Sequence, residues 1–312
     1  MSASTPAVDG RTRHYGDFYG LSEPEGDGAV VLVVGNCQAE SLRIALDGGG
    51  LRGVRVPAVH ELVESDLPHL ARWLARTDLL VSQPVRDGYH GLPLGTAQLA
   101  AGLPSSARVV RVPVVRFAGL YPAHAIVRPP SDASLVPPVV EYHDLRLVVR
   151  AAVASGSLSS ADLLPSLDPV AVRAVAELSR GELRRREAAH DAVVASDLFD
   201  APSFDQMRTL NHPGNPVWEA LASRVRQRLG LPEHVVDPGR PLLDSVHAPR
   251  EEAVVQAFGL DAAPTDHWTV AGRRVEGQEV EEAHLGWYAD HPDVVEAALV
   301  RHADTLRLLG RS

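Results

Sequence analysis

Cys37 is the residue whose position most strongly suggests chemistry. It is the one cysteine among 312 residues, and it follows a run of alanine, valine and leucine at 29–34 and the turn residue Gly35. Such a run is typical of a central parallel strand, and the residues from Gln38 have the apolar spacing of a helix. Cys37 is therefore expected at the amino end of a helix, where the dipole stabilises a thiolate and lowers the thiol pKa. The alternative is a small buried apolar side chain, as most cysteines outside disulfides are.

A catalytic cysteine needs a base, and the chain has fourteen histidines. His212 is the first candidate, because Asn211 and His212 belong to a polar loop that contains Pro213 and Pro216 and comes just before a predicted helix, and such loops often carry catalytic groups. The alternative is an exposed loop histidine without a function. His143, followed by Asp144, is a second candidate for base or substrate contact.

Amide groups near the cysteine are candidates for stabilising an oxyanion. Asn36 and Gln38 flank Cys37, and Gln83 ends another predicted strand, where it can instead make a local hydrogen bond. The arginine guanidinium group suits a ligand phosphate because it is planar and always charged. The candidate phosphate ligands near these strand ends are Arg43, Arg111, Arg116 and Arg128.

The composition excludes several kinds of chemistry. The chain contains no lysine, so a Schiff base, a lysine-bound pyridoxal phosphate and a Walker lysine are excluded. A formal net charge of −10 argues against nucleic-acid binding. No clustered His, Cys and carboxylate motif occurs, so no metal site is expected. GxGxxG is also absent, which disfavours a nucleotide cofactor bound through that motif.

The sequence also indicates a compartment. One cysteine cannot form an intramolecular disulfide and fits a reducing cytoplasm. Residues 1–9 lack the basic and apolar regions of a signal peptide, and no apolar run has the length of a membrane span. We therefore expect a cytoplasmic protein without a membrane span. Its oligomeric state is not indicated.

The order of predicted elements favours an α/β fold. Residues 1–28 read as a flexible amino-terminal arm. Residues 29–128 form the predicted α/β core, a doubly wound parallel sheet in which Cys37, Gln83 and Arg116 follow strand ends and should converge. Residues 139–312 read as a mainly helical region that carries the His212 loop and packs on the core as one unit. The predicted strands are 29–34, 54–59, 78–83 and 107–115, and the predicted helices are 39–46, 64–75, 96–101, 141–154, 169–196, 215–229, 251–258 and 293–309.

Four segments resemble the WcbI-type family of polysaccharide-biosynthesis acetyltransferases. They are Val33-Val34-Gly35-Asn36-Cys37-Gln38, Ser82-Gln83-Pro84, the block 112–122 and Asn211-His212-Pro213. The resemblance covers about residues 30–229. It implies binding of coenzyme A (CoA), with acetyl-CoA as substrate, and transfer of an acetyl group to a sugar hydroxyl of a glycan. Cys37 would be the reactive thiol and His212 its base, and Gly35 would lie at the coenzyme site with Arg43, Arg116 and Arg128.

The same segments are similar to SGNH-type hydrolases, which implies an SGNH- or flavodoxin-like core. Asn36-Cys37 stands where those enzymes have Asp-Ser, and Thr209 stands where their Asp-x-x-His motif has its aspartate. The residue that would orient His212 is therefore not identified. Two other functions remain open: a cysteine-dependent acyl hydrolase that uses the same residues, and a non-catalytic protein that binds CoA or a glycan.

Overall fold

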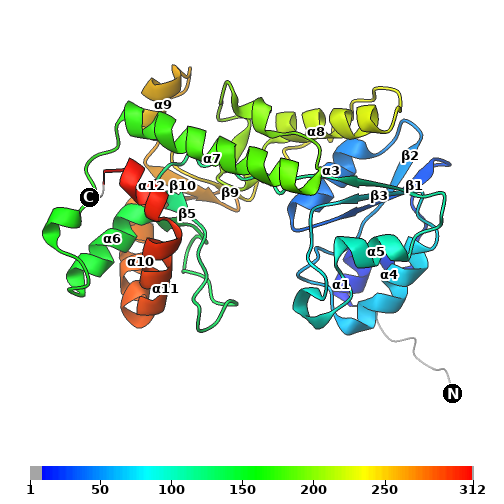
Figure 1. Cartoon of the computed structure of the whole chain (residues 1–312), viewed down its shortest axis with the longest axis horizontal. Helices are drawn as coiled ribbons and strands as arrows, with labels where there is room; N and C mark the ends of the chain where they lie inside the picture. Colours follow the sequence, from blue (N-terminus) through cyan, green and yellow to red (C-terminus); the bar gives the residue numbers. More distant parts are fainter. Residues whose placement is uncertain (1–8, 311–312) are drawn as a thin grey trace. The chain divides into compact units, whose positions relative to one another are not determined.

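The computed structural model describes residues 9–310, so the first eight residues of the predicted arm lie outside it. The chain forms two compact units that exchange segments (Figure 1). Unit 1 contains the residues up to Val114 together with Arg185–Ala195 and Asn215–Leu242, and unit 2 contains Val115–Arg184, Ser196–Gly214 and the residues from Leu243 on. Two segments of the region predicted as 139–312 thus belong to the unit that holds the parallel sheet.

Unit 1 is built on a four-stranded parallel sheet with the strand order β2-β1-β3-β4. The chain adds strands on one side of β1 and then on the other, so the order of strands reverses between β1 and β3. Ligands of doubly wound sheets bind beyond the carboxyl ends of the strands at such a point. The strands are β1 (Ala29–Val34), β2 (Leu51–Val54), β3 (Leu79–Ser82) and β4 (Arg108–Arg111).

Helices cover both faces of this sheet (Figure 1). Val30, Leu32 and Val34 of β1 point into a core shared with Trp73 of α4 and Leu99 of α5. The alternate residues of β1 face the other side, as the period of a strand requires. There α3 packs against β1 and α8. The helices are α3 (Gln38–Leu46), α4 (Leu67–Leu74), α5 (Thr96–Ala101) and α8 (Asn215–Arg228), and short 3₁₀ helices occur at Glu64–Asp66 and Tyr89–Gly91.

The described part of the predicted arm is ordered by its aromatic residues. It forms α1 (Gly10–His14) and α2 (Gly16–Tyr19), and the side chain of Phe18 is fully buried. Asp66 accepts hydrogen bonds from the Arg11 guanidinium group at 2.8 Å and from the Tyr19 hydroxyl at 2.7 Å. This segment is therefore part of the unit 1 core.

Unit 2 combines small antiparallel sheets with a helical layer. Its strands are β5 (His124–Ala125) paired with β6 (His143–Asp144), β7 (Met207–Thr209) paired with β8 (His212–Pro213), and a three-stranded sheet of β9 (Val246–His247), β10 (His267–Val270) and β11 (Arg273–Glu276). Its helices are α6 (Leu145–Ala154), α9 (Glu252–Phe258), α10 (Gly277–Asp290), α11 (Pro292–Arg301) and α12 (Ala303–Leu308), with 3₁₀ turns at Ser160–Asp162 and Ser196–Phe199. The long helix α7 (Pro169–His190) begins in unit 2 and ends in unit 1. Helices α10 and α11 pack on α6 around a buried cluster that includes Val148 and Val294 (Figure 1).

The structure confirms the predicted fold class and corrects several elements. The strand predicted at 54–59 is wrong, because β2 pairs with β1 from Leu51 and ends at Val54, before Pro57. The helix predicted from 141 begins only at Leu145, since His143 and Asp144 are used as a strand. The helix predicted to 196 ends at His190, and Asp191 has a positive φ of 47° that ends it. The sequence interpretation missed β9–β11 and α10 altogether.

Two structural features are absent from the described residues. Within residues 9–310, no helix is long and apolar enough to cross a membrane. Within the same part of the chain, no group of three or more His, Cys, Asp or Glu side chains is placed to hold a metal ion.

Candidate active site

Cys37 lies at the turn between β1 and α3, where the sequence predicts it. It has helical backbone angles, φ −52° and ψ −20°, and is the residue that precedes the first turn of α3. Its side chain is exposed, while Gln38 and Ala39 directly after it are buried. The thiol is therefore presented at the carboxyl edge of the sheet and the amino end of a helix, where the dipole favours a negative charge.

The side chain of Gln83 fixes this turn from the neighbouring strand. Its Oε1 atom accepts a hydrogen bond from the backbone N–H of Asn36 at 2.9 Å, and its Nε2 donates to Oε1 of Gln38 at 3.1 Å. Gln83 and Gln38 are 4% and 1% exposed, so both bonds are shielded from water. A Cβ atom on Gly35 would lie 2.4 Å from Oε1 of Gln83, which explains why glycine occupies this position. The two glutamines thus position the turn.

Asn36 is the amide of this turn that keeps a donor for a ligand. Its Oδ1 accepts the backbone N–H of Gln38 at 3.0 Å, which fixes the plane of the carboxamide. Within residues 9–310 its Nδ2 group has no hydrogen-bond partner, and the residue lines a cavity. The backbone N–H of Ala39 is already bonded to the Asn36 carbonyl at 2.9 Å. Of the three predicted oxyanion donors at the sheet edge, Asn36 is the one whose geometry fits that use.

Replacement of Gln83 by leucine is expected to loosen this turn. It would remove the acceptor of the partly buried N–H of Asn36 and the hydrogen bond to the buried Oε1 of Gln38, and we expect the free energy of unfolding to fall by about 2 to 4 kcal/mol. Urea denaturation measures this change. Gln278→Leu on the exposed surface of α10 is the matched control and should change stability by less than about 0.5 kcal/mol. Equal stability of the two variants would contradict the positioning role.

A cavity of about 670 Å³ opens beyond the carboxyl ends of β1, β3 and β4. Asn36 and Gln83 lie on its wall, together with Arg86, Arg111 and His190. Both arginine side chains are in exposed positions, and neither has an ion pair within the described part of the chain. Cys37 is not part of the wall but adjoins Asn36. The cavity occupies the place where the strand order reverses, and it offers two cationic groups to an anionic ligand.

Sequence reasoning named Arg111 as a candidate phosphate ligand but missed Arg86 and did not select His190 as a site residue. A signal for Arg86 was present, because it lies three residues after Gln83 and so follows the end of β3. His190 comes from the carboxyl end of α7, and its place on this wall depends on a bridge between Arg111 and Ala192. Pairing between segments this far apart in the chain is not visible in local patterns.

His212 begins β8 in unit 2, on a hairpin fixed by neighbouring groups. The Asn211 side chain is oriented by the Tyr142 hydroxyl, which donates to its Oδ1 at 2.8 Å. The Thr209 hydroxyl lies 3.0 Å from the Tyr142 oxygen and 3.2 Å from Oδ1 of Asn211. Thr209, which stands at the aspartate position of Asp-x-x-His motifs, therefore contributes to holding Asn211. These bonds fix the side chain next to His212 in the sequence.

The imidazole of His212 is neutral at physiological pH. Burial lowers its pKa from 6.5 to about 4, despite an opposing effect of Glu141. The ring lies edge-on to Tyr142, with ring centroids 6.1 Å apart. Its Nδ1 atom has no hydrogen-bond partner among residues 9–310. No carboxylate in that part of the chain orients this nitrogen, so the structure identifies no third member of a triad there.

The other predicted site residues have partners of their own. His143 is fully buried, with Nδ1 2.8 Å from the Tyr288 hydroxyl and Nε2 3.0 Å from the Val127 carbonyl. These contacts are those of a core histidine. Arg43 is bonded to Glu40 at 2.8 Å and to the Gly53 carbonyl at 3.3 Å.

The two remaining arginines belong to unit 2. Arg128 forms an ion pair with Glu141 at 2.8 Å, and Arg116 is half-buried near the start of the unit. Unit 1 thus brings together Gly35, Asn36, Cys37, Gln38 and Gln83, whereas unit 2 carries Asn211, His212, His143, Arg116 and Arg128.

The sheet order and the turn at its carboxyl edge define a doubly wound α/β protein. The model of the family described as polysaccharide biosynthesis enzyme WcbI matches residues 30–234. The chain therefore belongs to the WcbI family, and the resemblance seen in its motifs is confirmed.

A solved structure of WcbI has the same fold. It is described as a polysaccharide biosynthesis enzyme, in its native form without a disulfide bond between coenzyme A and one of its cysteines. It superposes with a TM-score of 0.74 over 91% of this chain and 100% of the other, at 18% identity. The sequence matches no curated protein.

Proposed function

We propose that this protein transfers an acetyl group from acetyl-CoA to a sugar hydroxyl during polysaccharide or glycoconjugate biosynthesis. The observation that carries the proposal is the exposed thiol of Cys37 at the amino end of α3, on a turn clamped by Gln83. Membership of a family of polysaccharide biosynthesis enzymes supports a sugar acceptor. The description of the solved relative, which mentions both coenzyme A and a cysteine, supports the donor.

The proposed reaction has two steps. In the first, His212 accepts the thiol proton of Cys37 while the sulfur attacks the thioester carbonyl. The tetrahedral intermediate then expels the thiolate of CoA, which takes the proton from His212 and leaves an acetyl-cysteine. The donor and the product are both thioesters, so this exchange is nearly balanced in energy. The Nδ2 group of Asn36 would donate a hydrogen bond to the oxyanion.

In the second step the acceptor replaces CoA. His212 takes the proton of the sugar hydroxyl, and the oxygen attacks the carbonyl of the acetyl-cysteine. The intermediate expels the Cys37 thiolate, which recovers the proton from His212. Because Cys37 and His212 belong to different units, the scheme requires both side chains to reach one substrate. A direct transfer, in which His212 activates the acceptor and Cys37 only contacts the coenzyme, is the competing route.

The covalent route predicts that acetyl-CoA alone modifies the protein. Brief incubation should add one acetyl group to Cys37 and nothing to Cys37→Ser, as measured by intact-protein and peptide mass spectrometry. Because the second step needs an acceptor, the acetyl group on Cys37 should persist without sugar and should be lost when an acceptor is added. Release of free acetate at a comparable rate without sugar would instead indicate an acyl hydrolase. An unmodified protein whose melting temperature rises with CoA would indicate direct transfer.

The cavity of unit 1 predicts where the coenzyme phosphates bind. Arg86 and Arg111 supply two guanidinium groups without ion pairs to other described residues, and charge-assisted bonds to phosphate are strong. We expect Arg86→Gln/Arg111→Gln to weaken CoA binding by about 30-fold or more, measured by calorimetry. The control Arg76→Gln/Arg228→Gln removes the same charge from two exposed ion pairs of unit 1 and should change the dissociation constant less than about twofold. Similar losses in both variants would contradict this location.

A further inference from the structure

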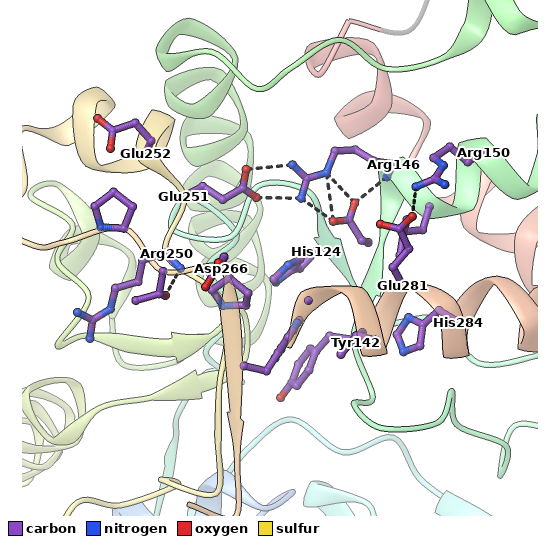
Figure 2. Close-up of a pocket in the computed structure, with 18 residues that line it drawn as sticks. His124, Tyr142, Arg146, Arg150, Arg250, Glu251, Glu252, Asp266, Glu281 and His284 are labelled. Carbon is purple, nitrogen blue, oxygen red and sulfur yellow. Dashed lines mark hydrogen bonds and ion pairs between the residues drawn. The ribbon is translucent and has the colours of Figure 1, made fainter. Parts of the chain in front are cut away.

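A second, larger cavity lies entirely within unit 2 (Figure 2). Its volume is about 810 Å³, and its wall comes from β5, β6, α6, β10, α10 and the segment before α9. The mechanism above uses none of its charged groups. A cavity of this size is large enough for a sugar residue with its neighbours.

The charges on the wall leave a negative excess. Five carboxylates line the cavity, against three guanidinium groups. Arg146 bonds to both oxygens of Glu251, at 2.9 and 3.0 Å, and also pairs with Asp144 (Figure 2). Arg150 pairs with Glu281 at 2.6 Å. These pairs fix the orientation of the polar groups, and the excess of carboxylates disfavours anionic ligands such as CoA, sugar phosphates and uronic acids.

Two buried histidines on the wall have unused hydrogen-bonding atoms. His124 is 8% exposed and His284 is fully buried, and Nδ1 of each ring has no partner among residues 9–310. Burial lowers the pKa of both rings, so each is neutral and offers one donor and one acceptor nitrogen in total. Nε2 of His284 already contacts the Pro138 carbonyl at 3.0 Å. A sugar hydroxyl, which both donates and accepts, matches such groups better than an ion does.

Tyr142 connects this cavity with the His212 hairpin. It is part of the wall, and its hydroxyl donates to Asn211 at 2.8 Å while its ring contacts that of His212. Trp268 stacks against Tyr142 and His124, with centroids 5.7 and 5.0 Å apart, and forms the apolar part of the wall. A ligand in the cavity would therefore contact the side chain that holds the catalytic loop.

We propose that this cavity binds an uncharged sugar residue of the glycan acceptor. The inference rests on the proposed function for the identity of the acceptor, and it adds a location and a charge class. The paired carboxylates and guanidinium groups would bind the hydroxyls, and His124 and His284 would satisfy those that point inward. The anionic donor and the neutral acceptor would thus use separate cavities of opposite charge preference.

Saturation-transfer NMR on the full chain tests the inference. The probes are the methyl glycosides of glucose, galactose, mannose and rhamnose, with glucuronic acid and glucose 6-phosphate as anionic counterparts. We expect at least one neutral probe to bind in the presence of saturating CoA, and both anionic probes to bind at least about tenfold more weakly. Binding by none of the neutral probes, or equal binding of the anionic ones, would overturn the proposal.

Paired variants locate the binding. Arg150→Gln/Glu281→Gln replaces a half-exposed ion pair on the wall and should weaken the neutral probe about tenfold, with little change in stability. The control Glu296→Gln/Arg301→Gln makes the same charge changes on exposed positions of α11 and should bind normally. His124→Phe keeps the ring and removes its nitrogens, and should also weaken binding. Unchanged binding in both wall variants would overturn the location. Acetylation of Cys37 by acetyl-CoA is measured separately, so failure of the acceptor site and failure of the proposed function are distinguishable.

Discussion

Replacing Cys37 by alanine is expected to lower kcat for acetyl transfer about 1,000-fold or more. Removal of a covalent nucleophile leaves only the catalysis provided by binding and oxyanion donors. The measurement is the release of free CoA thiol from acetyl-CoA in the presence of a sugar acceptor. Because the side chain is exposed and lies outside the buried glutamine pair, the free energy of unfolding should change by less than about 0.5 kcal/mol.

The control for this loss is the binding of CoA. Arg86 and Arg111 are untouched in Cys37→Ala, so the dissociation constant measured by calorimetry should stay within about threefold of the wild-type value. Cys37→Ser tests the chemistry more narrowly, because it keeps an attacking atom of lower nucleophilicity and should retain only a small part of the rate. A Cys37→Ala variant with a substantial part of the wild-type kcat would exclude the covalent route and leave direct transfer.

Replacing His212 by glutamine is expected to lower kcat by about 10²- to 10⁴-fold, the usual contribution of a general base. Glutamine preserves polarity but cannot accept a proton at these pH values. The imidazole lies edge-on to Tyr142, and its Nδ1 is unpaired within residues 9–310, so the fold should tolerate the change. His14→Gln, at an exposed position at the end of α1 and outside both cavities, is a histidine control that should keep most of kcat. Equal rates for wild type and His212→Gln would exclude His212 as the base.

The pH profile offers a second test of His212. A base must be unprotonated to act, and burial lowers the pKa of His212 to about 4. As the pH is lowered from 8, protonation of His212 should therefore cause no loss of kcat/KM around pH 6.5, the ordinary histidine pKa. The loss due to this residue should occur only near pH 4. If kcat/KM of the wild type instead falls near pH 6.5, and this fall is absent from His212→Gln, the lowered pKa of His212 is contradicted.

Folding must be followed in the same pH range. Burial lowers the pKa of His143 from 6.5 to about 4. Between pH 6.5 and 4, this imidazole is therefore protonated in the unfolded chain but not in the folded chain. The contribution of His143 to stability is therefore constant above about pH 6.5 and falls as the pH falls from 6.5 towards 4. Circular dichroism at each pH separates this effect from protonation of the base.

The sequence by itself determined the local features of the site. A run of apolar, mostly β-branched residues has few alternatives to a buried strand, and a glycine followed by helix-forming residues limits what comes next. Cys37 could therefore be placed at the amino end of a helix, and its motif led to the family. The helix at 96–101 and the class of the sheet were predicted for the same reason, because each depends on periodicity and on short-range turns.

Only the tertiary structure decided how the side chains are used. Gln83 is a plausible oxyanion donor in the sequence. In the structure β3 pairs with β1 so that Val34 lies beside Ser82, and the Gln83 side chain then bonds to the turn at Asn36 and holds it in place. His143 looks like a catalytic histidine in the sequence, yet its two nitrogens bond to groups from distant segments in a core. Partners of this kind are brought together by packing and not by spacing along the chain.

The lining of the two cavities was likewise decided by tertiary structure and not by local sequence patterns. Arg86, Arg111 and His190 come from three separate segments of unit 1, and the unit 2 cavity depends on β10 and α10, which the sequence interpretation missed. Local patterns report which faces of an element are apolar, because burial of those faces drives folding. Polar cavities form where the packed elements leave space, so their lining is fixed by the arrangement of the whole unit. Sequence therefore determined the position of the proposed nucleophile and the class of fold, and tertiary structure decided which residues surround that position.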